Sequence, residues 1–299
     1  MSTGLMGSRL LKTGIRPAAA GRERPRLSKR ARKALGTSVG IAIVAVMLFP
    51  LYWMFDASLL RPQDLVSRTP TWFPLHGTLD GYRNVLSSQG GHLLISLEVS
   101  LGTVILTLLV AAPAAYGMAK LRVPGRRALL FALLVAQMIP GIVMANSLYV
   151  VADRLELLNS PLALILADST LCVPFATLIL HSFLRGVPDE LGEAAAIDGA
   201  SRLRTFVSVI LPVARNAVIT AALFSFLFAW ADFLFAVTLT TQDDRAPVTV
   251  GIYRFIGANL TDWNSVMATG VIASIPAALL LIVAQRYVAA GIGSAAVKD

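Results

Sequence analysis

The chain has 299 residues, of which 56% are hydrophobic and only 14% are charged, and its mean hydropathy is +0.70. A water-soluble domain carries about a quarter charged residues, so this composition excludes a soluble globule and favours an integral membrane protein. The net charge of +9 would suit a nucleic-acid binder, but ten of the 26 Lys and Arg lie between Arg9 and Lys33, with no aromatic residue among them. Such a segment is more simply a cytoplasmic tail held on anionic lipid.

Six apolar stretches are each long enough for a transmembrane helix, which needs about 20 residues. They are Gly36–Leu59, Leu93–Leu121, Ala128–Val151, Pro161–Phe183, Ala214–Leu239 and Met267–Val288. Each stretch is continuous, whereas the strands of a membrane barrel alternate in polarity over about ten residues. The sequence therefore predicts an all-α integral membrane protein with six transmembrane helices. Prolines at positions 50, 113, 140, 174 and 276 predict kinks in five of them.

The distribution of positive charge predicts the orientation of these spans. Six spans put both termini on one side of the membrane. With that side in the cytoplasm, the inner segments hold 20 Lys and Arg, and the outer loops hold six. We therefore expect both termini in the cytoplasm. The chain then divides into a basic cytoplasmic tail (1–35), which we expect to be disordered, a transmembrane domain (36–290) and a C-terminal cytoplasmic tail (291–299).

Two outer segments, Leu60–His92 and Thr240–Val266, are long enough to do more than connect spans. Both mix aromatic and polar residues. Trp72, Phe73 and Trp263 in them also suit simple anchoring at the membrane interface, where aromatic side chains are enriched.

The inner segment between the fourth and fifth spans, residues 186–213, has the signals of two short helices. Pro188 followed by Asp189 and Glu190 predicts a helix start, because proline suits the first helical position and acids suit the positive end of the helix dipole. Gly199 fits the residue just past that helix. The segment is thus predicted to bend tightly at the cytoplasmic surface.

The second short helix is predicted to begin at Ser201, whose hydroxyl can cap it. Apolar residues then recur at helical spacing, at Leu203, Phe206, Val207 and Ile210, and Pro212 ends the helix. An alanine-rich first helix and a capped bend suit docking of another protein. An amphipathic connector resting on lipid is the alternative.

The residues of this segment resemble a known motif. Glu193-Ala194-Ala195, three residues, Gly199, nine residues and Val209-Ile210-Leu211-Pro212 resemble the EAA loop of ABC importer permeases, whose pattern is EAA-x3-G-x9-I-x-LP. The departure at Val209 is conservative. In that family the loop is the coupling helix that docks on the ATPase subunit. The resemblance implies an ATPase-coupling role for Glu193, Ala194, Ala195, Asp198, Gly199, Leu211 and Pro212.

Other stretches resemble the second permease subunit of maltose-type carbohydrate importers. They are TWFPLHGTLDGYRNVL from Thr71, WADFLFAVTLT from Trp230 and the ending YVAAGIGSAAVKD. The resemblance runs from about Leu35 to the C-terminus and implies a type I ABC importer-like fold in a bacterial plasma membrane. It implies import of a sugar or oligosaccharide, half of the translocation path, and a transport role rather than an enzymatic one. The implied partners are a second permease subunit, two ATP-binding subunits and an extracytoplasmic solute-binding protein.

No phosphate-binding loop of the form GxxxxGK[ST] is present, so we expect this chain to bind no cofactor and the partner ATPase to use ATP-Mg. Cys172 is the one cysteine and the three histidines are scattered, so we expect neither a metal site nor catalytic residues.

Polar side chains at membrane depth are costly and are therefore functional candidates. We expect the translocation path to include Gln137, Asn146, Trp230 and Asp232. Glu98 and Asp168 are weaker candidates, because snorkelling or packing also explains them.

Two other classes of protein are compatible with an apolar chain of this kind. A secondary transporter would couple to an ion gradient, often through inverted repeats, and no clear repeat is visible. A membrane-embedded enzyme would need clustered His, Asp or Glu, and no such arrangement appears. The sequence leaves open which sugar is carried and whether this chain contacts it.

Overall fold

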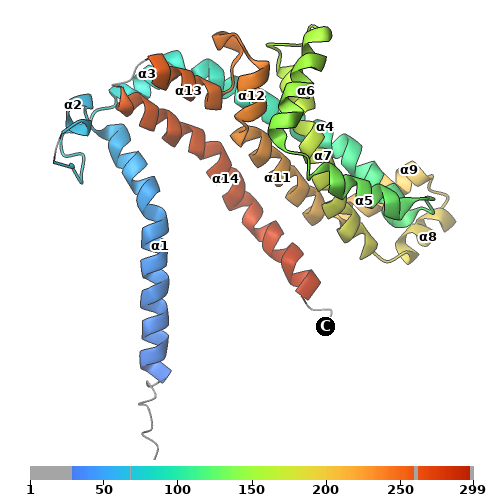
Figure 1. The fold of residues 1–299 in the computed structure, drawn as a ribbon. Coiled ribbons are helices and arrows are strands. Elements are labelled where there is room, and N and C mark those ends of the chain that lie inside the picture. The colour runs from blue at the N-terminus through green and yellow to red at the C-terminus, as the bar shows by residue number, and fades with distance from the viewer. Residues whose placement is uncertain (1–28, 68, 259–261, 297–299) are drawn as a thin grey trace, which may run out of the picture. The chain divides into compact units, whose positions relative to one another are not determined.

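The computed structural model describes residues 29–67, 69–258 and 262–296, and these residues form helices and connecting loops without a strand (Figure 1). The chain divides into two compact units, residues 1–50 and 51–299. Most of the expected N-terminal tail lies outside the described residues. The expected C-terminal tail is helical as far as position 296, and only its last three residues lie outside the described part.

Four helices are long and apolar enough to cross a membrane: α1 (Lys29–Leu59), α4 (Gly90–Lys120), α7 (Pro161–Arg185) and α14 (Trp263–Ala296). The number rises to six if two bent helix pairs each count as one span, Arg126–Ala136 with Gly141–Arg154 and Arg202–Val213 with Arg215–Ala231. In α1, every described side chain from Lys33 to Pro50 is exposed. A helix that is apolar all round and exposed suits contact with lipid.

The third predicted span is broken rather than continuous. Helices α5 (Arg126–Ala136) and α6 (Gly141–Arg154) meet at 95° across residues 137–140. Pro140 has no backbone N–H and cannot continue α5, so the chain turns and begins a new helix at Gly141. The expected proline kink is thus a full break at this position.

The fifth predicted span is also divided. It starts as α11 (Arg215–Ala231) and continues as the short helix α12 (Leu234–Leu239). The break lies at Asp232, whose carboxylate oxygens accept hydrogen bonds from Phe235 N (3.3 Å) and Ala236 N (2.9 Å). A carboxylate that binds the first N–H groups of α12 stabilises a new helix start, and the continuous helix predicted here was wrong.

The second unit is organised around α4 and α7, which pack against each other more extensively than any other described helix pair. The buried face of α4 carries small and hydroxyl side chains at helical spacing: Ser96, Ser100, Thr103, Thr107, Ala111 and Ala115. In a membrane, small residues let two helices approach closely. Gly102 shows how close, since a Cβ at this position would lie 2.4 Å from Ile165 Cδ1 on α7.

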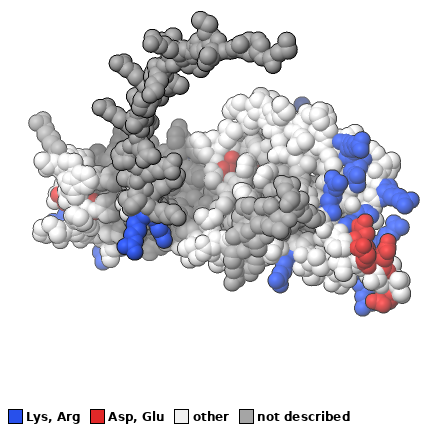
Figure 2. All heavy atoms as spheres, turned by 90° about the horizontal axis from the view of Figure 1, so that it is seen from below, with Lys and Arg blue, Asp and Glu red and all other residues white. Residues whose placement is uncertain are grey.

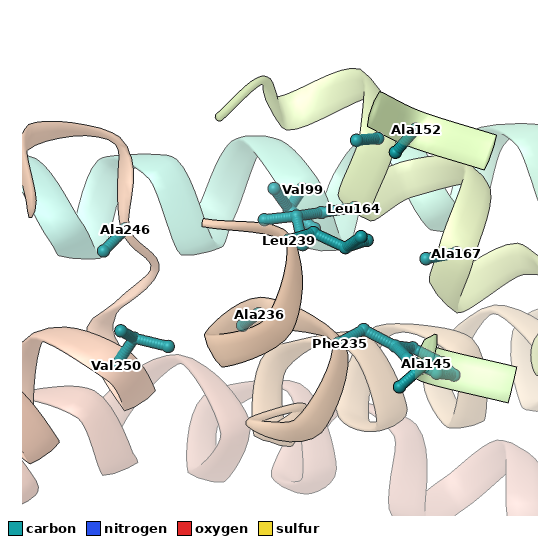
Figure 3. Close-up of a cluster of buried hydrophobic side chains, with 11 residues drawn as sticks. Val99, Ala145, Ala152, Leu164, Ala167, Phe235, Ala236, Leu239, Ala246 and Val250 are labelled. Atoms are coloured by element: carbon teal, nitrogen blue, oxygen red, sulfur yellow. The ribbon is translucent and has the colours of Figure 1, made fainter. Parts of the chain in front are cut away.

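A cluster of buried apolar side chains joins α6 and α12 to this pair (Figure 3). Phe235 of α12 lies next to Ala145 of α6 in the figure, and Leu164 of α7 lies near Leu239 and Val99. The stability of the short helix α12 therefore comes from this packing and not from the length of the helix.

Hydrogen bonds join three segments at one end of the second unit. Asn264, at the start of α14, donates through Nδ2 to Ser58 O (2.8 Å) and Leu60 O (2.7 Å) at the end of α1. Ser58 Oγ lies 2.7 Å from Tyr82 Oη on α3 (Asp80–Ser88). A single amide thus closes the end of α1 and fixes it to α14.

The start of α4 holds the other outer segment, which contains η2 (Asp243–Arg245) and α13 (Val248–Ala258). His92 Nδ1 lies 2.7 Å from Ala246 O, and Val248 N donates to Ser96 Oγ at 2.8 Å. Both outer segments named in the sequence therefore lie against the same end of the second unit.

Candidate coupling surface and translocation residues

The segment that resembles the EAA loop folds as two short helices. Helix α8 (Glu190–Ile197) starts after Asp189, so Pro188 lies before the helix and not at its first position as predicted. Asp189 does not cap α8 with its side chain, because its carboxylate is turned toward Lys120 on α4.

The predicted tight turn after α8 is confirmed. Gly199 has φ of +78°, a left-handed conformation that residues with a Cβ rarely adopt. Ala200 N donates back to Ala195 O at 2.9 Å, and Ser201 Oγ accepts from Arg204 N at 3.3 Å. These bonds close α8 and cap α9 (Arg202–Thr205), so the angle between the two helices is fixed locally.

The second helix does not have the single apolar face that the spacing predicted. After α9 the chain passes through the π-helical turn η1 (Phe206–Ile210) and then α10 (Leu211–Val213). Phe206 and Ile210 are buried, and the Phe206 ring lies 4.9 Å from that of Tyr116 on α4. Leu203 and Val207 are 71% and 51% exposed. The wider π turn directs Phe206 and Ile210 to one side of the chain and Leu203 and Val207 to the other.

Lys120, the last residue of α4, binds the start of residues 186–213, which are called the coupling segment below. Its Nζ donates to Val187 O and forms an ion pair with Asp189 Oδ1 at 2.6 Å. The Lys120 side chain is only 11% exposed, so this ion pair is partly shielded from solvent. From the sequence Lys120 is only one of the inner positive charges, because its two partners lie more than 60 residues away in the chain.

The motif residues differ in exposure. Glu193, Ala194 and Asp198 are exposed, whereas Ala195 is buried against its own chain. A surface cavity of about 420 Å³ lies beside α8, between the end of α4 and α9. Its wall includes Lys120, Asp189, Glu193 and Arg202.

Charge is also unevenly distributed over this end of the molecule. Figure 2 shows acidic side chains grouped there, with Lys and Arg side chains around them, and Figure 1 places α8 and α9 at this end. An exposed surface of mixed charge and small side chains suits docking of another protein.

The four residues expected along the path are not brought together. Gln137 is exposed at the α5–α6 break and Asn146 is exposed on α6. Trp230 is buried, stacks on Phe226 at 5.6 Å and donates from Nε1 to Ala273 O of α14 at 3.0 Å. Trp230 therefore joins α11 to α14. Asp232 has a structural contact too, since its carboxylate accepts hydrogen bonds from the start of α12.

The weaker candidates also separate. Glu98 is exposed on α4, whereas Asp168 on α7 is buried, and its Oδ1 has no hydrogen-bond partner. Cys172 is buried one turn further along α7. Within the described residues, no three His, Cys, Asp or Glu side chains are placed to hold a metal ion.

Comparison with known proteins identifies the family. The model of the binding-protein-dependent transport system inner membrane components matches residues 92–294, which include the two-helix segment and most of the spans. The chain belongs to this family.

Curated relatives and a solved structure agree. The sulfoquinovosyl glycerol transport system permease protein of Agrobacterium fabrum is 32% identical, over 84% of this chain and 89% of that protein. The trehalose transport system permease protein of Mycobacterium tuberculosis is 32% identical, over 86% and 94%. A bacterial ABC transporter that imports the acidic polysaccharide alginate matches in fold, with a TM-score of 0.75 and 22% identity over 88% of this chain and 99% of that one.

This permease is therefore a multi-pass membrane component of a binding-protein-dependent ABC importer, and it acts in transport rather than as an enzyme. Such a system implies an ATPase and a substrate-binding protein as partners. Family membership leaves the ion-coupled secondary transporter and the membrane-embedded enzyme without support.

Proposed function

We propose that this permease carries a sugar or oligosaccharide and forms half of the translocation path beside a second, different permease subunit. The names of its relatives support a carbohydrate, since they include transport systems for sulfoquinovosyl glycerol, diacetylchitobiose and trehalose. The low charge at membrane depth also suits a neutral solute.

The observation that carries the proposal is the two-helix segment Glu193–Pro212, with exposed Glu193 and Ala194 on α8 beside a fixed turn. In the proposed mechanism, two ATP-binding subunits close on ATP-Mg and move the docked helix α8, while this chain itself binds no cofactor. Movement of α8 reaches α4 through Lys120–Asp189 and through Tyr116–Phe206, which are direct contacts.

The solute-binding protein is proposed to deliver its cargo at the opposite end, where α3 and α13 lie. Both termini and the α8–α9 segment then lie on the cytoplasmic side of the plasma membrane. The excess of Lys and Arg on the inner segments supports this orientation.

Cysteine crosslinking tests the coupling role. A cysteine at Ala194, which is exposed, should crosslink to single cysteines in the docking cleft of the cognate ATPase, and the yield should change with ATP. Cysteine at the buried Ala195 is the matched control and should react much less. No crosslink from Ala194 to any ATPase subunit, together with uptake that depends on an ion gradient and not on ATP, would overturn the proposal.

A further inference from the structure

A cavity of about 350 Å³ lies where α7 and α11 meet the α5–α6 break. Its wall includes Cys172 and Phe175 near the middle of α7, and Phe224, Ser225 and Phe228 of α11. The cavity therefore lies near mid-depth of the spans. Small-molecule sites have volumes of about 300–1,000 Å³, so this one is large enough for a single small ring.

The broken span adds one polar side chain to a cavity wall that is mainly apolar. Gln137 at the break lines the cavity, and within the described residues its amide makes no hydrogen bond. The span stops at Ala136 and restarts at Gly141. Turn hydrogen bonds satisfy the carbonyls of Leu134, Val135 and Ala136, so the N–H groups of Gly141 and Ile142 are the helix-end groups left at the break within the described residues. Lipid cannot satisfy such groups, so this face must meet protein or a water-filled path.

The opposite wall is aromatic. Phe175 and Phe224 contact each other edge to face, with ring centroids 5.4 Å apart, and Phe228 stands one turn further along α11. All three rings are between 36% and 45% exposed, so each retains a free face. No Lys, Arg, Asp or Glu lines the cavity, so nothing in it would balance a charged solute.

We propose that this cavity is a solute subsite on the import path, where one ring of a sugar stacks on Phe224 or Phe228 and hydrogen-bonds to the amide of Gln137. Ring C–H groups meet the aromatic faces, and hydroxyls exchange hydrogen bonds with both ends of the amide. The proposal rests on the proposed function and adds that this chain itself contacts the solute.

Substitutions in the intact importer, reconstituted with its ATPase and binding protein, test the subsite. Phe228→Ala and Gln137→Leu should each lower uptake of radiolabelled maltose or trehalose about fivefold to tenfold, the loss expected for one stacking or hydrogen-bonding contact. ATP hydrolysis stimulated by the loaded binding protein should persist. Phe228→Trp should retain uptake, and Phe131→Ala, an exposed ring on α5 outside the cavity, should leave it unchanged.

Thiol labelling gives a second readout that a structural role would not move. A cysteine at Ile139, which lines the cavity, should react with a small maleimide more slowly when sugar is present. A cysteine at Ile142, exposed but outside the cavity, should react equally with and without sugar, and the parent chain with Cys172 alone supplies the background.

The outcomes separate the two proposals. Normal uptake by Phe228→Ala and Gln137→Leu, with no protection at Ile139, overturns the subsite and leaves the importer assignment intact. A wild-type complex that imports none of a panel of sugars, including those named for its relatives, overturns the carbohydrate assignment and the subsite together.

Discussion

Lys120 joins segments of the chain that lie 67 and 69 residues apart, at Val187 and Asp189. It is the one residue of α4 that bonds directly to the start of the coupling segment within the described contacts. Lys120 thus links the end of α4 directly to the residues that precede α8.

Lys120→Met keeps the apolar stem of the side chain and removes its charge. We expect the ratio of solute imported to ATP hydrolysed to fall about fivefold or more, since movement of α8 then reaches α4 only through Tyr116–Phe206. Arg127→Gln is the matched control, because Arg127 is an exposed cation of the next helix with no described ion pair. Equal ratios for both variants and wild type, measured in proteoliposomes, would contradict this role.

Gly81 is a second position where one residue decides a contact. A Cβ there would lie 2.2 Å from Asn264 Oδ1 and 3.0 Å from the Asn264 backbone oxygen. The Asn264 amide is held by the end of α1 and cannot turn away cheaply.

Gly81→Ala should therefore lower the free energy of unfolding by about 1–3 kcal/mol, because α3 and α14 must separate. Gly117→Ala, at a helical glycine of α4 with nothing within 4 Å of the added Cβ, should have no cost. Thermal unfolding of the detergent-purified importer measures both. Equal melting temperatures for the two variants would show that the α3–α14 contact is loose.

At the scale of elements, the turn between α8 and α9 is specified locally. Gly199 supplies the left-handed conformation, and Ser201 caps the following helix within three residues. The motif spacing fixes these positions, so the sequence predicted the turn correctly.

Two glycines of this segment should respond in opposite directions to alanine. Gly199→Ala should destabilise the segment by about 1 kcal/mol, since a Cβ disfavours positive φ. Gly192→Ala, inside α8 with open space around the added Cβ, should stabilise it by about 0.5–1 kcal/mol. Proteolysis rates of the segment in the detergent-solubilised chain report the difference, and shifts of the same sign would refute the turn geometry.

The broken span α5–α6 is one of two places, with the break at Asp232, where a continuous helix was expected. The run Ala128–Val151 is apolar throughout, and a proline in a membrane helix usually produces only a kink. Pro140 stops α5, and the packing of α6 against α12 and α7, which hydropathy does not record, accompanies the 95° break.

At the scale of the whole molecule, we expect both termini and the α8–α9 segment on the cytoplasmic side of the membrane. Asp244→Cys, in the outer segment with η2, should react in intact cells with a membrane-impermeant maleimide. Pro124→Cys, exposed between α4 and α5, should react only after the cells are permeabilised, because Lys120, Arg122, Arg126 and Arg127 hold that loop inside. The reverse pattern would invert the topology and remove α8 from the cytoplasm.

The sequence by itself determined the class of the protein and the position of the segment that resembles the EAA loop. Apolar runs long enough to span a bilayer indicate a membrane protein. The EAA-like spacing places Glu193 on a short helix and Gly199 on the turn that follows it. Both are local signals, since hydropathy and turn chemistry depend on neighbours in the chain.

Only the tertiary structure decided which side chains are exposed and which ones contact another helix. It buried Ala195 and exposed Ala194, joined Trp230 to α14 by a hydrogen bond, and placed Gln137 on the wall of a cavity. These outcomes depend on contacts between residues far apart in sequence. In an apolar chain nearly every helix face is a plausible packing face, so periodicity cannot choose among them, and only the close approach of particular helices can.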